Sequence, residues 1–131
     1  MIFVDTSALY ALADRADPRH REAVSLLDAL LSNGESLLTH NYVLLEAMAL
    51  VQHRLGVGPA LRLAESSDAF EVAWVDRALH DEAVRRLERS PKRRVSLVDH
   101  VSFLVMRERK AGKAFAFDPD FVAEGFLLVG S

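Results

Sequence analysis

The chain has 131 residues and a formal net charge of −3, which excludes two ordinary domains and nucleic-acid binding that is driven by overall charge. Half of the residues are hydrophobic and none is cysteine, which excludes a disordered chain, a disulfide scaffold and metal–thiolate sites. No basic segment precedes Asp5, and no apolar run approaches the roughly 20 residues that cross a bilayer. We therefore expect one soluble, cytoplasmic domain over residues 1–131, without a membrane, in which any contact with nucleic acid comes from local basic patches.

The first third of the sequence predicts a strand and two helices. Residues 2–5 are apolar up to an aspartate and fit a short buried strand, which leads into a helix over 7–14. Asp17 and Pro18 are residue types typical of an N-cap and a first helical position, so the second helix is expected to open there. Leucines at helical spacing give this helix an apolar face, and Gly34 marks its end.

The middle third continues the alternation of strands and helices. Residues 36–39 fit a second strand, after which Asn41 is expected to cap a helix that ends near Gly56. A shorter helix follows directly. A third strand is expected over 70–75. The two-residue alternation of side chains along that strand places Trp74 in the core.

The last third opens with a charged helix over 76–89. Ser96 and Asp99 have the spacing of a capping box, and the helix that they open is expected to end at Gly112. A short helical turn is expected after Asp118. The two remaining strands are expected at 114–117 and 126–129.

Strands that alternate with helices predict right-handed crossovers and a mainly parallel, five-stranded α/β sheet that is flanked by helices. In such sheets, ligands bind beyond the carboxyl ends of the strands. Asp5 and Asp118 follow two of the predicted strands, whereas Glu46 and Asp99 fall in the first turns of helices that start at the same edge. The sequence therefore brings four carboxylates toward one place.

Each of these acids also has an ordinary structural explanation. Asp5, Asp99 and Asp118 stand where an aspartate caps a following helix. Glu46 lies close to the apolar stripe of its helix, where a buried carboxylate costs several kcal/mol unless it is paired or binds a metal. A surface position at the edge of that stripe is the alternative for Glu46.

Four converging carboxylates repel one another, and this repulsion has to be relieved. Two carboxylates ~4 Å apart repel by about 4 kcal/mol at an effective dielectric constant near 20, and no basic residue sits beside any of the four, apart from Arg93 and Arg94 as candidate counter-ions. A divalent cation or protonation of one acid would relieve the repulsion. Oxygen ligands without His or Cys favour Mg²⁺ or Mn²⁺, which serve phosphodiester chemistry.

Four segments in this order resemble the PIN domain, and in particular the VapC-type toxins of toxin–antitoxin pairs. The resemblance covers essentially the whole chain and rests on the ordered set of segments rather than on any one of them. The segments are VDTSAL from residue 4, NYVLLEA from residue 41, LVDHVSF from residue 97 and AFDPDF from residue 116.

The resemblance implies a three-layer α/β/α fold, Mg²⁺- or Mn²⁺-dependent endoribonuclease activity, and homodimers. It also implies a small antitoxin whose C-terminal tail occupies the active-site groove, and hydrolysis that leaves a 5′-phosphate and a 3′-hydroxyl. In this resemblance Asp5 and Asp99 hold the main ion, and Glu46 and Asp118 help to place it or a second ion. The residues with supporting roles are the hydroxyl of Thr6 or Ser7 and, as a candidate fifth acid, Asp120.

Basic residues are densest just before the helix that carries Asp99. If this cluster faces the acidic edge it can hold RNA phosphates; the alternative is a solvated helix face that is paired with neighbouring acids. His100, next to Asp99, is expected to face outward, and none of the five histidines has the spacing of a zinc site. The candidates for RNA binding are Arg89, Lys92, Arg93 and Arg94.

The first two helices offer more apolar surface than is needed to cover one face of the sheet, with residues that include Tyr10, Leu12 and Leu27. They predict either a groove for a partner helix or additional core.

The leading interpretation is a metal-dependent endoribonuclease that acts as a toxin. The alternatives are a PIN ribonuclease of RNA processing, or a catalytically silent module of the same fold that binds RNA or protein. Loss of an acid would favour the silent module, and all four are present. A phosphatase of the HAD type would need a second aspartate two residues after Asp5, where this chain has Ser7.

Overall fold

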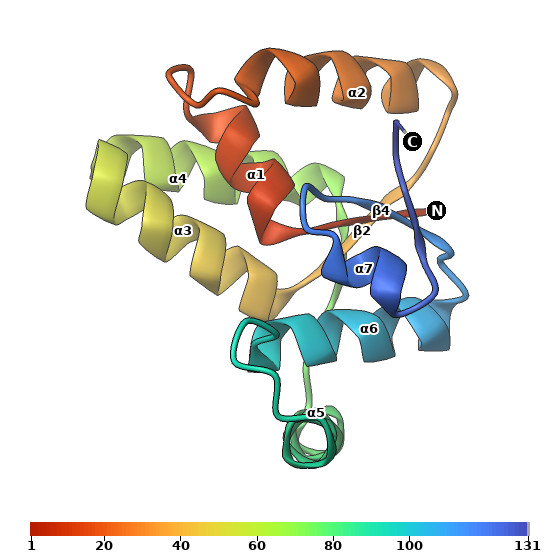
Figure 1. Cartoon of the computed structure of the whole chain (residues 1–131). Helices are drawn as coiled ribbons and strands as arrows, with labels where there is room; N and C mark the ends of the chain where they lie inside the picture. Colours follow the sequence, from red (N-terminus) through yellow and green to blue (C-terminus); the bar gives the residue numbers. More distant parts are fainter. Residues whose placement is uncertain (131) are drawn as a thin grey trace.

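The computed structural model describes residues 1–130, so only the last residue of the predicted domain lies outside the described part. Its five strands form one parallel sheet in the order β3-β2-β1-β4-β5, with β1 in the centre (Figure 1). The expected α/β class and sheet are confirmed. The strands are β1 (Ile2–Val4), β2 (Leu37–His40), β3 (Glu71–Ala73), β4 (Lys113–Phe115) and β5 (Leu127–Leu128).

The helices form two groups. Helices α1 to α4 pack on one another on one side of the sheet, while α5 and α6 pack together on the other side. Within residues 1–130 no helix is both long and apolar enough to cross a membrane. The helices are α1 (Thr6–Ala13), α2 (His20–Ser32), α3 (Asn41–Leu55), α4 (Val57–Ser66), the 3-10 turn Ser67–Ala69, α5 (Arg77–Arg89), α6 (Leu97–Arg109) and α7 (Asp120–Ala123).

The core lies around the central strand. All three residues of β1 are buried, as expected for a parallel strand that is covered on both faces. The ring of Phe103 packs edge-on against that of Phe121, with 5.2 Å between centroids, and stacks on that of Phe126. These phenylalanines and Phe115 lie in the core.

The start of α2 differs from the sequence expectation. The carboxylate of Asp17 accepts a hydrogen bond from the amide of Arg19 at 2.8 Å, so Asp17 closes a turn instead of capping a helix. Helix α2 begins at His20, whose Nδ1 lies 2.7 Å from the carbonyl of Ala11. The predicted opening at Asp17 and Pro18 is therefore wrong, because the chain first turns back onto the end of α1.

Two further helix ends also differ. His40, not Asn41, caps α3, since its Nδ1 accepts from the amide of Val43. Asn41 is the first helical residue, and its side chain accepts from the amide of Val75 at 2.7 Å. Helix α6 ends at Arg109 and not at Gly112, because the next residue takes a left-handed φ of 57°.

Trp74 was expected in the core, and this prediction is wrong. Strand β3 ends at Ala73, one residue before Trp74, and it lies at the edge of the sheet. Three-quarters of the tryptophan is exposed. The alternation of buried and exposed side chains along a strand therefore no longer determines the burial of Trp74.

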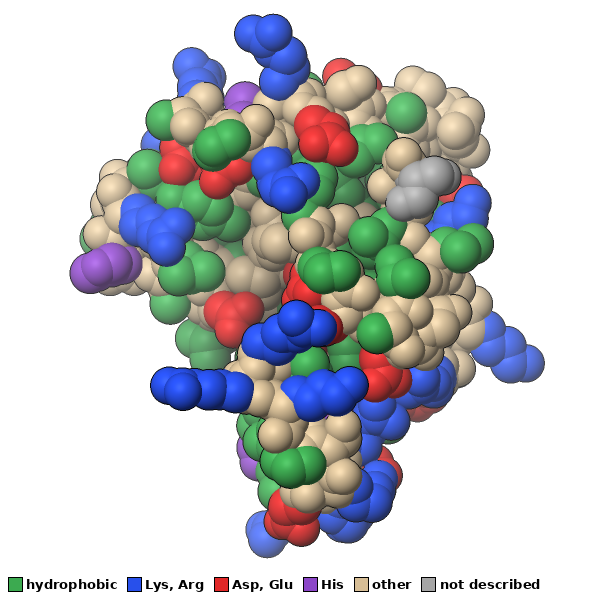
Figure 2. Space-filling view, in the orientation of Figure 1, with side chains coloured by type: hydrophobic (Ala, Val, Ile, Leu, Met, Phe, Trp, Pro, Cys, Tyr) green, Lys and Arg blue, Asp and Glu red, His purple; other side chains and the backbone are tan. Residues whose placement is uncertain are grey.

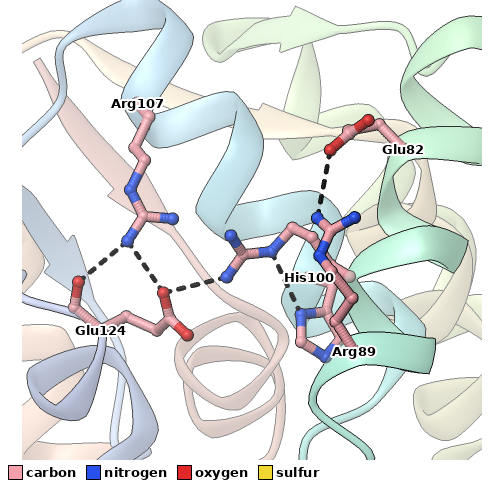
Figure 3. A network of polar contacts seen from close by, with 6 residues as sticks. Glu82, Arg89, His100, Arg107 and Glu124 are labelled. Atoms are coloured by element: carbon pink, nitrogen blue, oxygen red, sulfur yellow. Dashed lines mark hydrogen bonds and ion pairs between the residues drawn. The ribbon is translucent and has the colours of Figure 1, made fainter.

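A polar network joins α5, α6 and the end of α7 (Figure 3). Glu124 accepts from Arg86 at 3.0 Å and from Arg107 at 2.8 Å. Burial opposes ionisation of Glu124, but the two arginines outweigh it and hold the pKa of Glu124 below its usual value. Arg86 also donates to Nδ1 of His100, which is buried rather than outward-facing as expected. The arginine and the packing of α5 on α6 cover this histidine.

We expect Glu124→Gln to lower the free energy of unfolding by about 1–2 kcal/mol, because it removes the shared partner of the partly buried Arg86 and of Arg107. Urea unfolding of the variant and the wild type measures this difference. Glu82→Gln is the matched control, since the ion pairs of Glu82 are exposed and should contribute less than about 0.5 kcal/mol. Equal losses in the two variants would contradict a special role for Glu124.

Candidate active site

Asp5 follows the central strand directly and is almost fully buried. It caps α1, and its carboxylate accepts a hydrogen bond from the Ser7 hydroxyl at 2.9 Å. Burial raises the pKa of Asp5 to about 7; the Ser7 hydrogen bond opposes this rise and the charge of Asp99 adds to it. The capping explanation is thus correct, but it accounts for neither the burial nor the acidic neighbour.

The hydroxyl of Ser7 connects two parts of this edge. It donates to Asp5 and accepts from the amide of Phe117 at 3.0 Å, so it ties the end of β1 to the loop that carries Asp118. The neighbouring hydroxyl of Thr6 is buried and has no hydrogen-bond partner within residues 1–130. Of the two expected supporting residues, Ser7 therefore contacts the first aspartate, and Thr6 retains its hydrogen-bonding capacity.

Asp99 forms the expected capping box at the start of α6. Its carboxylate accepts from the amide of Ser96 at 2.9 Å, while its own amide donates to the Ser96 hydroxyl at 3.2 Å. Burial raises the pKa of Asp99 to about 6; the Ser96 amide opposes this, and the charges of Asp118 and Glu46 add to it. Asp99 is therefore both a cap and the member of the quartet whose pKa responds to two of the other acids.

Asp118 lies in the loop after β4. The strand ends at Phe115 rather than at Phe117, so the expectation that Asp118 directly ends a strand is wrong. Its Oδ1 accepts from the amide of Asp120 at 2.9 Å. Burial, and then the charge of Asp120, raise the pKa of Asp118. Asp120 is itself mostly buried, and the guanidinium of Arg94 lies 3.1 Å from its carboxylate.

Glu46 lies on the second turn of α3 and is partly buried. Its charge raises the pKa of Asp99, so the two side chains face the same region. Figure 2 looks onto this face: acidic side chains lie in its centre, and lysine and arginine side chains lie directly below them, over the loop between α5 and α6. Asp99 thus interacts electrostatically with each of the other three sequence-predicted acids.

The chemistry of this edge suits a hard divalent cation. Its donors are carboxylate and hydroxyl oxygens, which such ions prefer. Three of the carboxylates have raised pKa values among other acids, and the buried hydroxyl of Thr6 lacks a partner in the described part of the chain. Across residues 1–130, however, no three acidic or histidine side chains are close enough to enclose an ion. The quartet therefore remains a predicted ligand set.

The basic cluster divides into two parts. Arg85 and Arg89 pair with Glu82 on the exposed face of α5, as the surface-charge explanation predicts. Lys92 and Arg93 lie exposed in the following loop and form no ion pair within residues 1–130. Arg94 brings positive charge to the acidic edge, since it pairs with Asp120 and its charge opposes the rise in the pKa of Asp118.

An apolar groove of about 1360 Å³ opens away from the acids, between α1, α2 and α4. It reaches the amino ends of β2 and β3, so it lies at the opposite edge of the sheet. The excess apolar residues of the first helices are therefore only partly used by the core. Its lining includes Leu9, Leu12, Leu27, Leu37, Leu63 and Phe70.

The sheet order, the acidic edge and the ordered motifs define a PIN domain, and the chain matches this family over residues 2–126 and belongs to it. VapC20 of Mycobacterium tuberculosis, described as a 23S rRNA-specific endonuclease, is 39% identical over 131 residues, which cover 98% of each chain. Ribonuclease VapC26 of the same organism is 30% identical over 100 residues, 75% of this chain and 72% of the relative.

The crystal structure of M. tuberculosis VapC20, described as a toxin that cleaves the sarcin–ricin loop, has the same fold. It superposes with a TM-score of 0.85 at 36% identity over 97% of each chain. The protein is therefore a homologue of the VapC toxin ribonucleases, as the resemblance of its motifs predicted. The expected enzyme class, a ribonuclease, is confirmed at this level.

Proposed function

We propose that this protein is an Mg²⁺- or Mn²⁺-dependent endoribonuclease and the toxin of a toxin–antitoxin pair. The observation that carries the proposal is a pair of carboxylates with raised pKa values at the edge of a PIN sheet, the buried one of Asp5 and the partly buried one of Asp99. Buried carboxylates that repel one another are kept in a fold at a cost. Binding a cation and positioning it against a phosphate is the function that best accounts for them.

In this proposal Asp5 and Asp99 hold the principal ion, and Glu46 and Asp118 help to hold it or a second one. When bound, the ion supplies an activated water at neutral pH and offsets negative charge on the phosphate. The chain itself positions the ligands: Ser7 fixes the carboxylate of Asp5, and the capping box fixes that of Asp99. The expected products carry a 5′-phosphate and a 3′-hydroxyl.

The proposed substrate is RNA, and ribosomal RNA is the first class to test, since VapC20 is described as specific for 23S rRNA. The proposed partners are a small antitoxin and a second copy of this chain. The apolar groove between α1, α2 and α4 offers a surface on which an amphipathic segment of a partner can bury apolar area.

Calorimetric titration of Mn²⁺ into metal-free protein, followed by cleavage of a 23S rRNA fragment, tests the proposed function. We expect the wild type to bind Mn²⁺, and cleavage to stop when EDTA is added. Asp5→Asn should lose the Mn²⁺ binding that the wild type shows. Wild-type Mn²⁺ binding that persists unchanged in Asp5→Asn would place the ion elsewhere and refute the proposed ligand set.

We expect neutralisation of Arg93 and Arg94 to glutamine to weaken RNA binding and to flatten its dependence on salt. Each phosphate contact with a single strand contributes about 0.7 to the slope of log affinity against log salt, so the double variant should lose about 1.4. Fluorescence anisotropy with a labelled RNA at several salt concentrations measures the slope.

Lys110→Gln with Lys113→Gln is the control for that experiment, since it makes the same change in net charge. These lysines lie at the far end of α6 and at the start of β4, away from the acidic edge. Equal slopes for the two double variants would show that Arg93 and Arg94 contribute no more to RNA binding than other surface charges do.

A further inference from the structure

A polar pair lies in the middle of the apolar core. His40 of β2 and Ser102 of α6 are both fully buried, and Nε2 of the histidine lies 2.8 Å from the hydroxyl oxygen of the serine. Burying two polar side chains costs desolvation that an apolar pair of the same volume would avoid. Their presence calls for an explanation other than filling space.

The hydrogen bonds around this pair run in one direction. The amide of Val43 donates to Nδ1 of His40, so the ring proton lies on Nε2. Nε2 therefore donates to the Ser102 hydroxyl, which donates in turn to the carbonyl of Val98 at 3.0 Å. Burial lowers the pKa of His40 to about 3, so the imidazole is neutral near pH 7. The chain of bonds connects the first turn of α3 with the first turn of α6.

His40 contacts the three elements that carry three of the acids. Its ring stacks on that of Phe3, with 5.7 Å between centroids, and Phe3 lies in β1 two residues before Asp5. The same ring caps α3, which carries Glu46. Through its other nitrogen it bonds to α6, whose third residue is Asp99.

We propose that the His40–Ser102 pair is a positioning clamp that fixes the first turns of α3 and α6 and thereby the separation of Glu46 from Asp99. The proposal rests on the proposed function, since that function gives the separation its importance. Apolar contacts have no preferred direction, whereas a buried hydrogen bond holds its partners at a defined distance and angle. His40 and Ser102 are positioning residues that act through the two helices.

Ser102→Ala tests the clamp because it removes the shared hydroxyl and leaves the cap of α3 in place. Loss of a residue that orients metal ligands typically lowers metal affinity or activity by 10- to 100-fold. We expect a fall in Mn²⁺ affinity and in kcat of about this size, with an unchanged KM for RNA. Wild-type Mn²⁺ affinity and kcat in this variant would overturn the proposal.

A second variant and a control separate positioning from general stabilisation. His40→Asn keeps an oxygen that can accept from the Val43 amide, but its side chain is too short to replace the bond to Ser102. It should show the same loss, and the double variant no greater one. Ser67→Ala removes another mostly buried hydroxyl, which donates to the Ala64 carbonyl at 2.6 Å just before β3. An equal loss of Mn²⁺ affinity in this control would refute a positioning role.

Hydrogen exchange of the metal-free protein distinguishes failure of the clamp from failure of the proposed function. In Ser102→Ala, we expect faster amide exchange in the first turns of α3 and α6, and unchanged exchange in the first turn of α5. Unchanged exchange in α3 and α6 overturns the clamp whether or not an ion binds. A wild type that binds no Mn²⁺ and cleaves no RNA contradicts the proposed function instead.

Discussion

Asp99→Asn is expected to reduce RNA cleavage by at least about 100-fold and to lower Mn²⁺ affinity. The size follows from comparison with residues that only orient metal ligands, whose loss already costs 10- to 100-fold. The substitution keeps the shape of the side chain and an oxygen that can accept from the Ser96 amide. It removes the negative charge that a cation requires. Cleavage of a labelled RNA and calorimetry with Mn²⁺ measure the two effects.

Asp76→Asn is the matched control for this substitution. Asp76 caps α5 and accepts from the amide of Leu79 at 2.8 Å, so it shares the capping role of Asp99 but not the acidic neighbours. Asp76→Asn should unfold within about 1 kcal/mol of the wild type, and Asp99→Asn should be at least as stable as the wild type without metal, since it removes a carboxylate whose pKa is raised. Unchanged cleavage by purified Asp99→Asn, or an equal loss in Asp76→Asn, would exclude a catalytic role for Asp99.

Asp5→Asn is expected to stabilise the metal-free protein, and to do so more strongly at pH 7.5 than at pH 5. Asp5 has a pKa of about 7 when folded, against 3.8 as its ordinary value, which corresponds to about 4 kcal/mol of cost for the charged form. The neutral amide avoids this cost and can still accept from the Ser7 hydroxyl. The advantage of the variant should grow by roughly 2 kcal/mol between the two pH values.

The sign follows from proton counts. Between pH 4 and pH 7 the unfolded chain has released the proton of Asp5 and the folded chain retains it, so the contribution of Asp5 to stability falls as the pH rises. The buried His40, with a pKa lowered to about 3, acts in the opposite direction below its ordinary value of 6.5. The free energy of unfolding of the wild type therefore contains two contributions that change with pH in opposite directions. The difference in this free energy between variant and wild type isolates the contribution of Asp5.

Urea unfolding at several pH values, with EDTA and then with Mn²⁺, measures this difference. Mn²⁺ should reverse the order, because an ion that binds only the folded wild type stabilises it by mass action. Asp17→Asn is the control, since Asp17 lies in an exposed turn. A difference between Asp5→Asn and wild type that does not change with pH would show that Asp5 is charged in the folded metal-free protein.

The parts of the fold that follow from local patterns could be predicted from the sequence. Alternating apolar and helical segments gave the parallel sheet, and its carboxyl edge gave the meeting place of Asp5, Asp99 and their neighbours. The capping box of Ser96 and Asp99 was predictable because both partners lie within one turn. Residue type and spacing were sufficient in these cases.

The remaining features depend on contacts between distant segments. Nothing near His40 in the sequence indicates that its second nitrogen meets Ser102, and the bond from Ser7 to Phe117 spans 110 positions. Trp74 was misplaced because a period of two holds only while strand pairing continues, and pairing ends one residue earlier. The signal that could have identified His40 is its position between a strand and a helix, where a residue able to accept a hydrogen bond is expected.

The order of the acids along the chain determines when the site can exist. Asp5 is made before Asp118, and β4, the neighbour of β1 in the sheet, is made after α6. A nascent chain that has emerged from the ribosome only as far as α6 lacks both β4 and Asp118. A protein proposed to cut RNA is thus without its complete site until β4 and Asp118 have emerged from the ribosome and can fold against β1.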